Sequence, residues 1–210
     1  KYSEEEKYEQ VFRQADDLMY NQKLINKTDF DNSMMSHLKS ILLENDPAWQ
    51  SHAQRVSDLC KQIGVRLALG PNELNRLETA GLLHDIGKAV IDKTILTKKE
   101  GLNEYEVKEM KRHCEIGYKV PSHFNRYRDI AECVLFHHER PDGTGYPIGL
   151  QGPQIPLCSA IINIANAYDA ITEGGAYGEK RSPEEAAKEF RANAGTQFDA
   201  DLAKVFVEEI

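Results

Sequence analysis

The sequence lacks the marks of several protein classes. It has no apolar run long enough to span a bilayer and no visible signal peptide, so we expect no membrane insertion by this segment. Its four cysteines show no Cys-x-x-Cys spacing, which favours a reduced, cytoplasmic protein. The formal net charge of −8 supplies no counterion-releasing surface, so we do not expect polymeric nucleic acid as a partner. A small anionic ligand stays possible, because a metal and a few local cations can reverse the field inside one pocket.

Helical periodicity runs along most of the chain, and neither a convincing strand nor an internal repeat appears, so we predict an all-α fold. Asp46 is predicted to cap a helix, with Pro47 at its first position. We expect Asn72 to cap the next helix, and Asn103 to begin another with a capping box. The predicted helices cover residues 4–26, 33–43, 46–69, 72–84, 103–119, 127–138, 156–172, 182 onward and 199–209, with a connector at 26–29 and a glycine- and proline-rich loop at 140–155.

Histidine is scarce, with seven in 210 residues, and three of the seven lie in two short motifs. The first motif is His84-Asp85 at the end of an apolar stripe. An isolated His-Asp pair is usually incidental, but on a helix Lys88 would lie one turn from both residues. A carboxylate between two metal sites can bridge both cations, and Lys88 can then steady a phosphate oxygen. The motif therefore indicates metal-assisted phosphate chemistry.

The second motif is His137-His138, which directly precedes the predicted loop. Adjacent helical residues point about 100° apart, so a shared ligand role requires this pair to lie at or near a helix end. Alone, the pair would be interpreted as surface histidines at a helix terminus. The following segment, 142–147, reads Asp-Gly-Thr-Gly-Tyr-Pro and can place an aromatic ring and backbone N–H groups near a ligand. That context favours a binding site.

The other histidines carry weaker signals. His52 and His113 are evenly balanced between metal ligands and ordinary helical residues, while His37 and His123 are interpreted as surface residues.

Five segments occur in one order: His52-x-x-Arg55-Val56, Leu82-Leu83-His84-Asp85-Ile86-Gly87-Lys88, His113-x-x-x-Gly117, the run 137–150, and Tyr168-Asp169-Ala170. In this order they resemble the HD-GYP family of HD-domain phosphohydrolases, from about residue 46 to the C-terminus and including 195–199. The resemblance implies an HD-domain helical bundle with a Gly/Pro-rich Gly-Tyr-Pro loop. It also implies two, sometimes three, metal ions and hydrolysis of cyclic di-GMP, or a related cyclic dinucleotide, to linear products.

The resemblance assigns residues to a centre of two divalent ions bridged by Asp85. The first ion would be held by His52, His84, Asp85 and, at a family aspartate position, Asn166; the second would be held by Asp85, His113, His137 and His138. A hydroxide held between the metals would attack phosphorus, and Lys88 would stabilise the resulting charge. Iron or manganese suits such ligands, and zinc or nickel stays open.

Substrate contacts are implied for Lys88 and for four loop residues, Arg140, Asp142, Gly145 and Tyr146. For Arg140 and Tyr146, support of the loop is the alternative role.

The chain departs from the family pattern at three positions. Asn166 replaces an aspartate ligand, and its neutral amide should bind the first metal more weakly; Asp169 lies one turn further and would need a shift to substitute. Relatives place an arginine shortly after Thr172, whereas here none occurs before Arg181, which would cost about 1.5–3 kcal/mol of binding. Ala48, four residues before His52, argues against a third metal. A cyclic-dinucleotide receptor or structural module, or a hydrolase of a linear nucleotide, therefore stay open as alternatives.

The N-terminal region suggests a longer parent protein. The chain begins at Lys1, so we expect a fragment of a larger cytoplasmic signalling protein. Residues 15–20 resemble the closing helix of a GGDEF domain, although an ordinary amphipathic helix gives the same stripe. We expect a linker helix over 1–32, an HD-GYP domain over 33–210, and a homodimer formed through the apolar face of the first helix.

Overall fold

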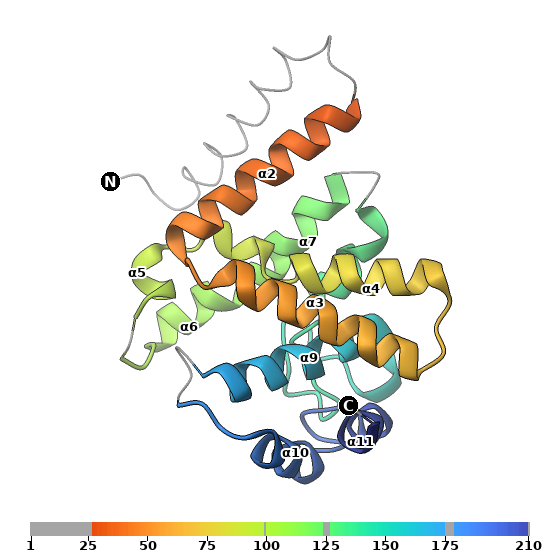
Figure 1. Cartoon of the computed structure of the whole chain (residues 1–210). Helices are drawn as coiled ribbons and strands as arrows, with labels where there is room; N and C mark the ends of the chain where they lie inside the picture. Colours follow the sequence, from red (N-terminus) through yellow and green to blue (C-terminus); the bar gives the residue numbers. More distant parts are fainter. Residues whose placement is uncertain (1–26, 99, 124–126, 175–178, 210) are drawn as a thin grey trace.

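The computed structural model describes residues 27–98, 100–123, 127–174 and 179–209, and it is helical (Figure 1). Within these ranges no strand occurs, and the β-type pairing consists of two isolated bridges, Asp142 with Gln151 and Ala194 with Phe198. The predicted all-α fold is confirmed. The predicted helix over 4–26 and the segment 15–20 lie outside the described residues. None of the described helices has the length and apolarity needed to cross a membrane.

The described elements are α-helices and three short 3-10 helices, which are labelled η. In chain order they are α2 (Lys27–Asn45), α3 (Trp49–Arg66), α4 (Pro71–Leu83), η1 (Ile86–Val90), α5 (Lys93–Leu96), α6 (Glu104–Lys111), α7 (His113–His123), η2 (Arg128–Ile130), α8 (Ala131–Leu135), η3 (Gly152–Gln154), α9 (Leu157–Glu173), α10 (Pro183–Ala192) and α11 (Ala200–Glu209).

Helix starts follow the local capping chemistry. The capping box at Asn103 is confirmed, because its side chain accepts from Glu106 N at 2.9 Å and its N–H donates to Glu106 Oε2 at 2.8 Å. The prediction for Asn72 was wrong by two residues. Gly70 is the N-cap of α4, since Pro71 fits the first helical position and Glu73 accepts the Gly70 N–H at 3.0 Å.

Three other boundaries differ from expectation. Asp46 does not cap α3, which begins at Trp49; its carboxylate instead accepts from Ala48 N within the turn after α2. The connector predicted over 26–29 was wrong for residues 27–29, which belong to α2. The helix predicted over 103–119 is two helices that meet at Arg112, so His113 begins a helix of its own.

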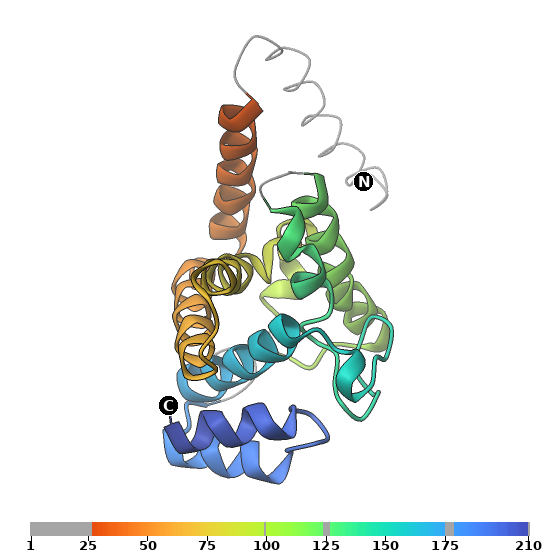
Figure 2. The same ribbon diagram turned by 90° about the vertical axis from the view of Figure 1, so that its right-hand side faces the viewer.

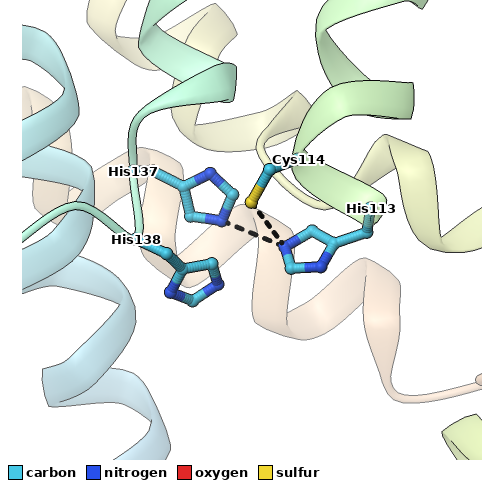
Figure 3. A group of neighbouring side chains, drawn as sticks. All are labelled: His113, Cys114, His137 and His138. Atoms are coloured by element: carbon cyan, nitrogen blue, oxygen red, sulfur yellow. Dashed lines mark hydrogen bonds between the residues drawn. The ribbon is translucent and has the colours of Figure 1, made fainter. Parts of the chain in front are cut away.

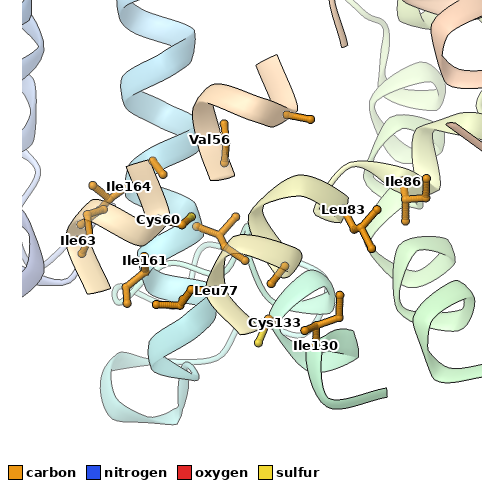
Figure 4. Close-up of a cluster of buried hydrophobic side chains, with 14 of the residues drawn as sticks. Val56, Cys60, Ile63, Leu77, Leu83, Ile86, Ile130, Cys133, Ile161 and Ile164 are labelled. Carbon is orange, nitrogen blue, oxygen red and sulfur yellow. The ribbon is translucent and has the colours of Figure 1, made fainter. Parts of the chain in front are cut away.

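The core forms where α3, α4, α8 and α9 pack (Figures 1 and 2). On α3, Val56, Cys60 and Ile63 repeat at three and four residues and are fully buried (Figure 4). Gly81 on α4 lets the two backbones approach, since a Cβ there would lie 2.9 Å from Ser57 Cα. Each fully buried large aliphatic side chain contributes about 1.5–3 kcal/mol. This packing fixes the helices whose ends carry the histidines.

Candidate metal centre

Four separate segments bring the predicted ligands together. His52 lies in the first turn of α3, and His84 and Asp85 follow the last residue of α4. His113 is the first residue of α7, and His137 lies just beyond α8. The histidine pair thus follows a helix end, as expected, because α8 ends at Leu135 rather than at residue 138.

Lys88 contacts Asp85 from a different helix type than predicted. The expectation that His84, Asp85 and Lys88 share an α-helix was wrong, because α4 ends at Leu83 and Lys88 lies on the 3-10 helix η1. Their contact nevertheless forms, with Lys88 Nζ 2.6 Å from Asp85 Oδ2. The tighter 3-10 winding, in which residues three apart eclipse, preserves that proximity.

Gly87 holds this turn against α7. A Cβ on Gly87 would lie 2.0 Å from the His113 carbonyl oxygen and 2.6 Å from Gly117 N. Only glycine permits this approach without displacing the backbone. The close contact holds η1, which directly follows Asp85, against the backbone of His113.

Asp85 lies between two groups of histidines. Its Oδ2 is 3.7 Å from His52 Nε2 and 3.4 Å from His84 Nε2, and those two nitrogens are 3.3 Å apart. Its Oδ1 is 3.5 Å from His113 Nε2. One carboxylate therefore faces both groups.

The second group gathers around His113 (Figure 3). His113 Nε2 is 3.4 Å from His137 Nε2 and 3.4 Å from Cys114 Sγ. Ligand atoms of His113, Cys114, His137 and His138 all lie within 4.8 Å of one another. Cys114 was missed by the sequence analysis.

Backbone hydrogen bonds fix the tautomers of three of the histidines. Each ring places Nδ1 against the carbonyl oxygen three residues earlier, and a carbonyl can only accept, so Nδ1 carries the hydrogen. The pairs are His84 with Gly81, His113 with Met110 and His137 with Val134, at 2.7, 2.6 and 2.6 Å. The Nε2 lone pairs of His113 and His137 therefore lie 3.4 Å apart, and that of His84 lies 3.4 Å from Asp85 Oδ2, an arrangement that is favourable when a cation lies beside them.

Burial keeps the second group neutral. It lowers the pKa of His113 to about 4 and holds the pKa values of His137 and His138 well below their usual range. A neutral imidazole is the form that binds a metal.

Asp85 is buried and charged. Burial acts to raise its pKa, but the Lys88 charge and the contact with His52 outweigh this and hold the pKa well below its usual value. Its Oδ1 accepts no hydrogen bond from the described residues. A buried carboxylate oxygen without a donor, beside nitrogen lone pairs, is what a divalent cation would satisfy, so these residues fit the metal centre that the resemblance implies.

Asp169 supports His52 from behind. Its Oδ2 is 2.7 Å from His52 Nδ1, and Arg55 donates to both of its oxygens. Burial lowers the His52 pKa, but the bond to Asp169 and the neighbouring Asp85 raise it to about 9. Asp169 is thus placed to orient the ring of the predicted ligand His52. Asn166 lies one turn earlier on α9, half-buried.

The loop after His138 places Tyr146 beside the second group. The rings of Tyr146 and His138 are stacked, with centroids 4.8 Å apart, and Lys111 Nζ lies 4.8 Å from the tyrosine ring centroid. A Cβ on Gly145 would lie 2.4 Å from Arg140 N, so Gly145 allows the loop to fold back on itself.

Asp142 and Arg140 contact one another within the loop. Asp142 Oδ1 accepts from Thr144 N and Oγ1 at 2.9 and 2.6 Å, and Arg140 Nη2 lies 3.4 Å from Asp142 Oδ2. These contacts are local to the loop.

Glu139 anchors the loop and was also missed as a functional residue. Its side chain is buried and accepts backbone N–H groups from Ile148, Gly149 and Leu150 at 2.8 to 3.1 Å. A glutamate directly after His138 could have suggested a role, but the sequence does not show which donors it meets.

The comparisons with known proteins identify the family of this chain. A family model described as HD domain matches residues 36–202. The chain belongs to the HD-domain family. This confirms the resemblance at the level of the family and of the helical fold.

Three curated relatives are similar to this chain over part of their own length. The cyclic di-GMP phosphodiesterase response regulator RpfG of Xanthomonas campestris is 35% identical, over 79% of this chain and 44% of its own. The 3'3'-cGAMP-specific phosphodiesterase 2 of Vibrio cholerae is 32% identical, over 75% of this chain and 31% of its own length. The cyclic di-GMP phosphodiesterase of Thermotoga maritima is 31% identical, over 86% of this chain and 50% of its own length. The chain thus spans half or less of the length of these relatives.

A solved structure supports the HD fold. Bd1817, an HDG"Y"P protein from Bdellovibrio bacteriovorus, aligns with a TM-score of 0.64 at 17% identity, covering 92% of this chain and 67% of that one.

Proposed function

We propose that this HD domain is a metal-dependent phosphodiesterase that hydrolyses cyclic di-GMP, or a related cyclic dinucleotide, to linear products. The observation that carries the proposal is the Asp85 carboxylate between two histidine groups, 3.4 Å from His84 Nε2 on one side and 3.5 Å from His113 Nε2 on the other. The curated relatives support the substrate class, because they are named as cyclic di-GMP or cGAMP phosphodiesterases.

Two divalent ions would supply Lewis-acid activation of water and of a phosphoryl oxygen. The chain would hold them through His52, His84, Asp85 and Asn166 on one side and through Asp85, His113, His137 and His138 on the other. The histidine-rich set suits iron or manganese, and zinc or nickel also bind such ligands.

Lys88 is the proposed electrostatic group. Its ammonium lies 2.6 Å from Asp85 Oδ2, so it is beside the centre where charge on a phosphoryl oxygen develops. A preorganised cation there stabilises the transition state more than the ground state. Arg140 and Tyr146 are the proposed substrate contacts in the loop, with Tyr146 next to His138. For Asp142 and Gly145 we propose a supporting role, because their contacts shape the loop.

A cyclic-dinucleotide receptor is the second candidate function. It is favoured by Asn166, whose neutral amide replaces a family carboxylate, and by the lack of an arginine between Thr172 and Arg181. A chain that binds a cyclic dinucleotide but hydrolyses it slowly would be consistent with both departures from the family pattern.

The deciding experiment compares anaerobic turnover of cyclic di-GMP by the chain as given and by Asn166→Asp, with iron(II) or manganese(II) supplied. Turnover by the unmodified chain supports the phosphodiesterase. Turnover only by Asn166→Asp supports the receptor, because the hydrolytic centre would then be intact except for one ligand. No turnover by either, with both ions bound, contradicts cyclic di-GMP hydrolysis. His37→Ala is a matched control, since His37 is exposed on α2.

The wider assignments stay predictions. They are a homodimer, a GGDEF domain upstream in the parent chain and a cytoplasmic location.

A further inference from the structure

A cysteine lies inside the second histidine group. Cys114 is the second residue of α7, its side chain is fully buried, and its sulfur points at His113 and His137 (Figure 3). Its Sγ is 3.4 Å from His113 Nε2 and within 4.8 Å of the ligand atoms of His137 and His138. The motif that begins at His113 leaves this position open, so the resemblance gives Cys114 no role.

The distances match the edges of a coordination shell. A tetrahedral ion with bonds of about 2.05 Å to nitrogen and about 2.3 Å to sulfur has nitrogen–nitrogen edges of about 3.3 Å and sulfur–nitrogen edges of about 3.6 Å. The His113 and His137 Nε2 atoms are 3.4 Å apart, and the sulfur–nitrogen distance is 3.4 Å. Two of the three edges thus match, and the third, from the Cys114 sulfur to the His137 ligand atom, is at most 4.8 Å. His113, His137, His138 and Cys114 could complete a tetrahedral shell, to which Asp85 would add a fifth ligand.

We propose that Cys114 binds the second metal ion as a thiolate, its proton leaving to solvent when the ion enters. The inference rests on the metal centre of the proposed function and deepens it. Thiolate is a soft ligand, so the second site would prefer zinc, cobalt or iron(II) over manganese. A site built from histidines and a carboxylate alone would discriminate less between these ions.

The competing role for Cys114 is that of a neighbour that never binds the ion. Because His113 Nδ1 donates to Met110 O, its Nε2 is an acceptor, and the Cys114 S–H can donate to it at 3.4 Å. Such a thiol would shape the pocket and leave the metal spectrum unchanged. The two roles therefore differ in a spectroscopic signature that a purely structural contact would not produce.

The test is anaerobic titration of the chain with cobalt(II), read by near-ultraviolet absorption, in the unmodified protein and in Cys114→Ser and Cys114→Ala. We expect a thiolate-to-cobalt charge-transfer band in the unmodified chain that both variants lose. We also expect both variants to lose more than about tenfold of the preference for zinc over manganese at the second site. Loss of a residue that only supports a metal ligand already costs about tenfold or more in affinity. Cys60→Ala is the matched control, because Cys60 is equally buried but packs in the apolar core.

The outcomes separate the two proposals. Binding of two cobalt ions without the band in the unmodified chain overturns the thiolate ligand and leaves the proposed phosphodiesterase intact; this result needs no variant to fold. A band that persists in Cys114→Ser also overturns it. Failure of the unmodified chain to bind cobalt would contradict the metal centre itself.

Discussion

Asp169 Oδ2 lies 2.7 Å from His52 Nδ1, on the opposite side of the imidazole from His84. The contact joins α9 to α3 and turns the other ring nitrogen toward Asp85. A carboxylate behind a ligating histidine fixes its tautomer and strengthens it as a ligand.

Asp169→Asn should therefore weaken the first metal site. The amide retains the side-chain shape but removes the charge that orients His52, so we expect the affinity of the first site to fall about 10- to 100-fold while the second changes less. Competition with a chelator measures both affinities. Asp58→Asn on the exposed surface of α3 is the control. Equal affinities in Asp169→Asn and the unmodified chain would show that this contact does not support the ligand.

Gly87→Ala should destabilise the fold around the centre. The new Cβ would be 2.0 Å from the His113 carbonyl oxygen, so η1 and α7 would have to separate. We expect a loss of about 1–3 kcal/mol in the free energy of unfolding, the range for overpacking. Urea denaturation measures it. Gly101→Ala is the matched control, because a Cβ there meets no atom within 4 Å; similar effects at both positions would refute the close-approach argument.

Glu139→Gln should loosen the loop without removing a ligand. The backbone N–H groups of Ile148, Gly149 and Leu150 would lose a charged acceptor, and hydrogen bonds to charged groups contribute about 1.5–3 kcal/mol. We expect faster hydrogen exchange at residues 148–150. Glu132→Gln serves as an exposed control. Unchanged exchange in Glu139→Gln would mean that other contacts hold the loop.

Removal of metal should lower thermal stability. An ion that binds only the folded chain stabilises it by about 2.7 kcal/mol at a hundred times its dissociation constant. Differential scanning calorimetry with and without a chelator should show this difference in the unmodified chain and a smaller one in His137→Ala. A chelator without effect would contradict metal binding at this centre.

The sequence predicted the parts of the molecule that depend on local pattern. Apolar periodicity indicated the helices, and the capping box at Asn103 located the start of α6. Motif order also pointed to the histidines at positions 52, 84, 113 and 137, whose rings lie close together in the structure. Helix boundaries were less accurate: α4 starts at Pro71, and its N-cap, Gly70, lies two residues before the capping asparagine we expected.

The contacts that depend on tertiary packing could not be predicted. His52 and Asp169 are 117 residues apart, and no spacing rule connects them. From the sequence, Cys114 was interpreted as one of four scattered small hydrophobic residues. The structure places its sulfur 3.4 Å from His113 Nε2. Lys88 met Asp85 as expected, but through a 3-10 turn and not a continuous helix.

The most direct test of the central claim is product analysis after anaerobic incubation of cyclic di-GMP with the iron(II)-loaded chain and with Asp85→Asn. Asp85 is the residue that faces both histidine groups, so its replacement should remove a carboxylate that would be available to both ions. We predict linear dinucleotide from the unmodified chain and a rate lower by more than about a hundredfold in Asp85→Asn, comparable with the loss of a transition-state-stabilising group. Equal product from both proteins, or none from the metal-loaded unmodified chain, would contradict the account.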